Sequence, residues 1–155
     1  MNMKKILTAL ALTIVSTGAA ADTWSPQGTI GLANVGNIAV KKGINLNCGL
    51  SGSTTVDAAG NSSVGSLSLS GFLCGSVTFT KLPYTLVGNA DNTVTLHNVN
   101  VNAITGDCFG NITGDFNQAT GELTFNAAQL PSVGTGANCE ISGTISTNPQ
   151  ASFVP

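Results

Sequence analysis

Apolar and polar residues alternate in short runs along much of this chain. The run SLSL places Leu67 and Leu69 between serines, and TVTL places Val94 and Leu96 between threonines. A period of two is typical of strands that bury one face. After the first 21 residues, no segment repeats its apolar residues at the 3.6-residue spacing of a helix. We therefore expect an all-β protein.

Runs rich in Gly, Asn and Asp separate the alternating stretches. They read DAAGN at 57–61, GNADN at 88–92, NQATGE at 117–122 and GTGAN at 134–138. Because these residue types readily adopt positive φ, the runs favour tight turns. Strands punctuated by turns at intervals of roughly 8–12 residues predict a single antiparallel β-sandwich or barrel-like domain over residues 44–155.

The alternation also predicts which face each side chain occupies. In SVGSLSLSGF, Phe72 continues the apolar face after a glycine. In NTVTLHNVNV the apolar face shifts near His97 and Asn98, which predicts a β-bulge. The apolar faces defined in this way comprise Val64, Leu67, Leu69, Phe72, Val77, Phe79, Val94, Leu96, Val99, Val101, Leu123 and Phe125.

One phrase occurs twice, as NCGLSGS around Cys48 and as NCEISGT around Cys139. We interpret it as one type of strand used twice, with the cysteine anchored in the core. Gly52 and Gly143 would then relieve crowding against a neighbouring strand. The alternative is a repeated ligand site, but the phrase brings together neither charges nor metal ligands.

The first 21 residues have the three parts of a secretory signal peptide. A basic start, MNMKK, precedes the apolar run ILTALALTIV and small residues that end in an A-x-A site. The apolar run is shorter than the roughly 20 residues that a membrane-spanning helix needs, and no later stretch is long enough. We expect residues 1–21 to be removed and the mature chain to be exported, to the periplasm or out of the cell.

Residues 22–43 differ from the rest, because glycines separate their short alternating patches. They predict an N-terminal segment of two or three edge strands. The alternative is a mobile strand that pairs with a neighbouring molecule by strand addition.

Charged residues are scarce and mostly acidic. The expected mature chain has three lysines, no arginine and seven acids, a formal net charge of −4. Nucleic acids and anionic membranes attract clustered Lys and Arg, so we expect neither as a partner.

The four cysteines form an even set in a chain that we expect to be exported, which predicts disulfides. We favour Cys48–Cys74 and Cys108–Cys139 among the three possible pairings, because each bridge would close one half of the chain. No C-x-x-C spacing supports a zinc site.

A catalytic constellation is not evident. His97, the lone histidine, stands in an alternating strand, and no G-x-S-x-G elbow occurs. No pair of acids stands out as a glycosidase pair, and no calcium loop is complete. We predict no catalytic residue, no cofactor and no metal site. The acids considered are Asp22, Asp57, Asp91, Asp107, Asp115, Glu122 and Glu140.

Trp24 and Tyr84 are the only large amphipathic aromatic residues. A carbohydrate-binding face usually displays several such rings. We therefore expect both side chains to fill the ends of the core, with an exposed Trp24 as the alternative.

Four stretches resemble a known family of small exported bacterial proteins, the protein activators of alkane oxidation. They are LNCGLSGS, LCGSVTFTKLPYTL, CFGNITGDFNQATGELTF and NCEISGTI. The resemblance runs from about Gly43 to Pro149 and rests on the cysteines, the Leu-Pro-aromatic step and the late hairpin. It implies a helper for growth on hydrophobic alkanes, and a place in the biofilm matrix, with which related members are associated. No catalytic residue is carried over.

The leading functional hypothesis is therefore a non-enzymatic secreted protein that assists contact with alkanes, with a hydrophobic substrate or matrix components as partners. The alternative is a fibre subunit or adhesin that exchanges strands, which would self-associate. An exported hydrolase is the third and weakest hypothesis.

Overall fold

The computed structural model describes residues 22–155, almost entirely as antiparallel strands. The expected signal peptide lies outside the described residues. The strands are β1 (Thr23–Ser25), β2 (Gly28–Lys42), β3 (Ile44–Val56), β4 (Ser62–Ser70), β5 (Thr78–Thr80), β6 (Tyr84–Gly88), β7 (Thr93–Asn102), β8 (Cys108–Asn117), β9 (Glu122–Leu130), β10 (Cys139–Asn148) and β11 (Ser152–Val154), with a 3₁₀ turn, η1 (Cys74–Ser76), before β5.

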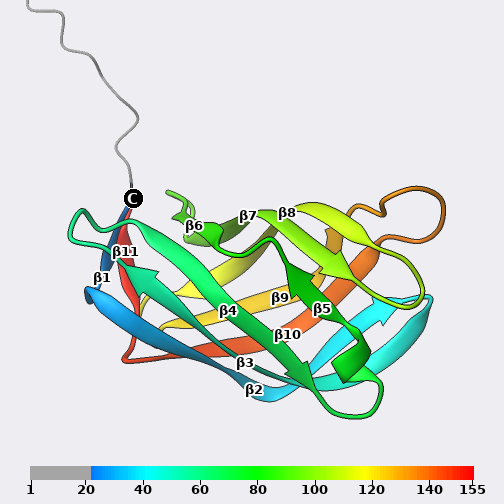
Figure 1. Cartoon of the computed structure of the whole chain (residues 1–155). Coiled ribbons are helices and arrows are strands. Elements are labelled where there is room, and N and C mark those ends of the chain that lie inside the picture. Colours follow the sequence, from blue (N-terminus) through cyan, green and yellow to red (C-terminus); the bar gives the residue numbers. More distant parts are fainter. Residues whose placement is uncertain (1–21) are drawn as a thin grey trace, which may run out of the picture.

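The main sheet closes on itself as an eight-stranded barrel (Figure 1). Its order is β7-β6-β4-β3-β2-β10-β9-β8, and β8 pairs with β7 to complete the circle. β5 and β6 pair with different parts of β7 and together occupy one strand position. The expectation of an all-β, barrel-like domain is therefore confirmed.

Closure changes the environment of the N-terminal segment. We expected edge strands in residues 22–43, but β2 pairs with β3 on one side and β10 on the other. That expectation was wrong for β2, because closing the barrel brings the first long strand against the last one. Within the N-terminal segment, only β1 lies outside the barrel, where it forms a two-stranded sheet with β11.

Most of the alternating aliphatic residues are buried inside the barrel, as expected. The predicted bulge is also present, because the register between β7 and β8 shifts between Leu96 and Val99, and Asn98 has φ 57°. The prediction that Phe72 lies on the buried face was wrong, since its side chain is 86% exposed. β4 ends two residues earlier, and Gly71 with φ 117° turns the chain away from the strand.

Two disulfides brace the barrel at the same end. One joins Cys48 in β3 to Cys74 in η1, and the other joins Cys108 in β8 to Cys139 in β10. All four cysteines are buried. The two strands that carry the repeated cysteine phrase, β3 and β10, flank β2 and run in the same direction.

The two ends of the barrel differ in their connections (Figure 1). We call the right-hand end in Figure 1 the open end. It carries the connections β2–β3, β4–β5, β7–β8 and β9–β10. The opposite end, which we call the closed end, carries the remaining hairpin turns and the β1–β11 sheet.

Candidate binding site in the barrel and at its open end

The residues that sequence analysis considered for catalysis do not form a shared site. His97 lies in β7, whereas Asp57 and Asp91 lie in separate turns at the closed end. Within residues 22–155, no group of three His, Cys, Asp or Glu side chains is placed to hold a metal ion.

The acids of the closed-end turns bond to the chain next to them. Asp57 Oδ1 accepts hydrogen bonds from the backbone N–H groups of Ala59 and Asn61, both at 2.9 Å. Asp91 Oδ1 accepts one from the Thr93 hydroxyl at 2.6 Å. Hydrogen bonds from Asn61 and Thr93 lower the pKa of the respective carboxyl groups. These carboxylates therefore order turns.

Tyr84 fills part of the core, as expected, and its hydroxyl also joins two strands. It is 1% exposed, and its hydroxyl donates to the carbonyl oxygen of Thr80 or Asn100, 2.6 and 2.9 Å away. Desolvation by burial is the main cause that raises the pKa of the Tyr84 phenol.

The inside of the barrel contains a cavity of about 90 Å³ with an almost entirely apolar wall. Aliphatic side chains supply most of the wall, together with the rings of Trp24, Phe79, Phe116 and Phe125. An eight-stranded barrel has an interior just wide enough to be filled by side chains or to hold one small ligand. An apolar cavity of this kind stays dry, so its wall is available to an apolar molecule.

An aromatic lid closes one end of this cavity. Trp24 of β1 packs on Phe153 of β11 and on Phe116 of β8, with ring centroids 4.8 and 5.6 Å apart. Asp22 holds the lid in place, because its Oδ2 accepts hydrogen bonds from Trp24 Nε1 at 2.5 Å and from the backbone N–H of Gly88 at 2.7 Å. The expectation that Trp24 fills one end of the core is confirmed.

A second hollow, also of about 90 Å³, lies at the open end. It shares Val40, Val77, Val101 and Cys139 with the wall of the inner cavity. Its outer wall includes Ile44 at the start of β3, and Leu73 and Ile104 from two of the connections. The hollow therefore adjoins the inner cavity across these four side chains, while the lid covers the closed end.

Exposed apolar side chains surround the open end. Each of its four connections carries at least one in or next to its turn. The other exposed large hydrophobic residues of the described chain are Val35, Phe109 and Val154. We call this set the apolar rim, and it consists of Ile44, Phe72, Leu73, Ile104 and Val133. Phe72 and Ile104 are more than four-fifths exposed. Clustered exposed apolar side chains mark a surface that contacts another apolar body.

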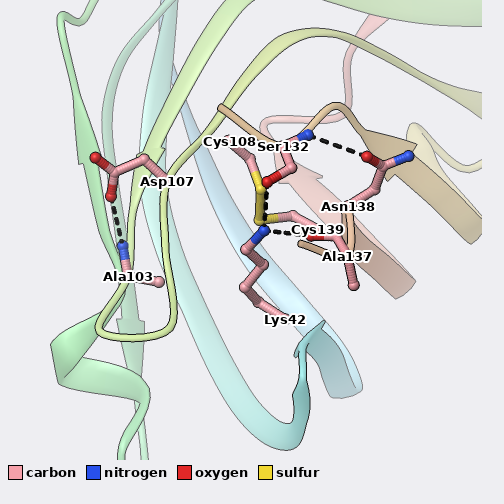
Figure 2. Close-up of a disulfide and its surroundings, with 8 residues drawn as sticks. All are labelled: Lys42, Ala103, Asp107, Cys108, Ser132, Ala137, Asn138 and Cys139. Carbon is pink, nitrogen blue, oxygen red and sulfur yellow. Dashed lines mark hydrogen bonds between the residues drawn. A yellow bond between two sulfur atoms is a disulfide. The ribbon is translucent and has the colours of Figure 1, made fainter. Parts of the chain in front are cut away.

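A buried lysine fixes one side of the open end (Figure 2). Lys42 is only 7% exposed, and its Nζ donates to Ser132 Oγ at 2.7 Å and to the Ala137 carbonyl. Both acceptors lie in the β9–β10 connection, beside the Cys108–Cys139 disulfide. The lysine and the disulfide thus tie this connection to the barrel, which keeps Val133 in place on the rim.

Sequence reasoning missed both parts of this candidate site. It assigned Phe72 to a buried face, and it did not single out Ile104 or Val133. The available signal was that each of the four open-end connections carries a large apolar residue in or next to its turn. The closed-end turns, DAAGN, NADN and QATG, contain none.

These features define a class of protein: a small, disulfide-braced antiparallel barrel with an apolar interior and apolar side chains around one end. The chain belongs to the PraA/PraB-like family of alkane oxidation protein activators, whose family model matches residues 1–155. The family resemblance noted in the sequence is thereby confirmed. Searches among curated proteins and among solved structures gave no match. The family is described as one of activators rather than of enzymes.

Proposed function

We propose that this protein is a non-enzymatic, exported helper for growth on alkanes, and that it contacts hydrocarbon surfaces with its apolar rim. The observation that carries the proposal is the placement of exposed apolar side chains in or next to all four connections of one end. The family description supports a hydrocarbon as the partner, because a helper of alkane oxidation would work next to a liquid with which only apolar side chains mix.

The turns of the closed end support contact by the open end. The closed-end turns are polar and include Asp57 and Asp91. A protein with one apolar end and one polar end adsorbs to an oil–water interface in a single orientation, because only one end gains by leaving water. Two disulfides are compatible with export. Within residues 22–155, no helix has the length and apolar character needed to cross a membrane.

The proposal is tested by weakening the rim. We expect the double variant Phe72→Ser/Ile104→Ser to adsorb to hexadecane droplets at least tenfold more weakly, because burying one such side chain contributes about 2 kcal/mol. The matched control is Val154→Ser. Val154 is also an exposed aliphatic residue, 70% exposed, but it lies in β11 at the closed end. This control should adsorb like the unchanged protein.

Growth measurements then connect adsorption with function. A strain that lacks the protein should grow slowly on liquid alkane, and added purified protein should restore growth, whereas the rim variant should not. Normal growth of the deletion strain, or full rescue by the rim variant, contradicts the proposal. Fractionation of cells, medium and biofilm matrix would locate the exported protein and test the matrix role.

A further inference from the structure

We infer that the inner cavity binds the end of a single unbranched saturated hydrocarbon chain, which enters through the hollow at the open end. The inference rests on the proposed function, which brings this end of the barrel to a hydrocarbon surface. It goes further because it assigns a ligand to the interior of the barrel. The proposed function involves only adsorption through the rim.

The chemistry of the cavity wall selects an uncharged, apolar ligand. Its few polar side chains already have partners. Thr54 Oγ1 lies 2.7 Å from Ser62 Oγ, Thr147 Oγ1 donates to the Gly121 carbonyl at 2.7 Å, and Glu140 accepts from Gln129 at 2.7 Å. No buried side-chain nitrogen or oxygen of the described residues lacks a hydrogen-bond partner. A polar ligand would lose its bonds to water and gain none here.

The shape of the space selects a narrow chain. The inner cavity and the hollow at the open end each measure about 90 Å³ and share four wall residues. For scale, an engineered apolar cavity of about 150 Å³ accepts benzene. The barrel therefore has room for a short alkyl segment that lies along its axis. Trp24 and Phe116 of the lid stop the chain at the closed end.

Trp24 provides a direct readout, because it is the only tryptophan and its ring forms part of the cavity wall. A bromine atom quenches tryptophan fluorescence only near contact. We expect soluble 1-bromoalkanes to quench Trp24 at saturating concentration. Acrylamide, a polar quencher, should have little effect, because Trp24 is 3% exposed. Affinity should rise about fourfold with each added methylene group until the cavity and hollow are full, and then level off.

A wide ligand tests the shape of the site in the unchanged protein. 1-Bromoadamantane is as apolar as a bromoalkane but too broad for a channel that holds one chain. It should leave Trp24 fluorescence unchanged. Equal quenching by the adamantyl compound, or quenching by bromoalkanes that never saturates, overturns the inference.

Variants of the cavity and of the rim separate this inference from the proposed function. Val101→Phe fills the junction of the cavity and the hollow. It should weaken bromoalkane quenching at least tenfold, while droplet adsorption persists. Val77→Leu should weaken the quenching less, because it adds less volume at the same junction. Phe72→Ser/Val133→Ser, a rim variant whose two residues line neither the cavity nor the hollow, should do the reverse. If bromoalkanes do not quench Trp24 but rim-dependent adsorption and growth rescue hold, the inference fails and the proposed function stands. If saturable quenching occurs but the rim variant rescues growth fully, the proposed function fails and the cavity still binds alkyl chains.

Discussion

Two glycines let neighbouring strands approach one another closely in this barrel. A Cβ added to Gly52 of β3 would lie 2.2 Å from the carbonyl oxygen of Ser66. A Cβ added to Gly143 of β10 would lie 2.7 Å from Ile38 Cδ1, and this glycine also has φ +140°. The glycine of the repeated cysteine phrase therefore has the same role in both copies, which is to admit an adjacent strand.

A substitution at Gly52 tests this role. We expect Gly52→Ala to lower the free energy of unfolding by about 1–3 kcal/mol, because the backbone of β4 must move. Gly65→Ala is the control, since Gly65 lies in β4 and no atom lies within 4 Å of an added Cβ. Urea unfolding measures both. Equal stability of the two variants would show that β3 and β4 adjust without cost.

The carboxylate of Asp57 makes part of the stability depend on pH. Hydrogen bonds from Asn61 are the largest cause that lowers its pKa in the folded protein. A lowered folded pKa means that this contribution is complete above the unfolded pKa of about 3.9 and is lost as the pH falls through the folded value. We expect Asp57→Asn to be less stable than the unchanged protein at neutral pH, and the difference to shrink below about pH 4. Urea unfolding between pH 7 and pH 2 measures it, and a difference that stays constant with pH would contradict the assignment.

At the scale of secondary structure, two of the three shortest strands, β1 and β11, have a large effect because they form the lid. β1 and β11 have three residues each and pair only with one another. Side chains of the closed-end hairpins hold β11, since the backbone N–H of Phe153 donates to Gln118 Oε1 at 3.0 Å. The Phe153 ring then fills the space above Gly88, where a Cβ would lie 2.3 Å from it.

Removing one ring should therefore open the lid. We expect Phe153→Ala to cost about 3–5 kcal/mol of stability and to shift the fluorescence of Trp24 to longer wavelength, because its packing partner is lost. Val154→Ala changes the neighbouring residue, which is 70% exposed, and should be nearly neutral. Urea unfolding followed by fluorescence distinguishes the two. An unshifted spectrum in Phe153→Ala would mean that Trp24 is held by its other contacts alone.

At the scale of the whole molecule, charge and apolar exposure are divided between the two ends. Lys41 and Lys42 lie at the open end with the apolar rim. Most acids lie toward the closed end. They are Asp22, Asp57, Asp91, Asp115 and Glu122. If the proposed function holds, this division should give the barrel a preferred orientation at a boundary between water and oil.

Hydrogen exchange should detect that orientation. In a hexadecane emulsion we expect amide exchange to slow in the open-end connections and to stay unchanged in the closed-end turns, because only the former face the oil. The open-end segments are residues 43, 71–77, 103–107 and 131–138, and the closed-end segments are 57–61, 89–92 and 118–121. The same protein without oil is the reference. Slower exchange at the closed end would show that the barrel adsorbs the other way round.

The class of fold was predictable because it depends on local pattern. Alternation along each strand determines which side chains are buried, and Asn, Asp and Gly determine where the chain turns. Each of these two signals is contained in a few consecutive residues. The bulge at Asn98 and the space requirement at Gly52 were predictable for the same reason.

The candidate site was not predictable, because it depends on closure. β2 pairs with β10, which lies more than 90 residues later in the chain. No local pattern in either strand indicates that the two strands pair. Phe72 follows the alternating pattern of its run, yet it is exposed because the strand ends before it. The sequence by itself determined the strands, their buried faces and their turns, since these follow from neighbouring residues. Only the tertiary structure decided that the strands enclose an apolar cavity and that four separate connections form one rim, because strand pairing over long separations brings those residues together.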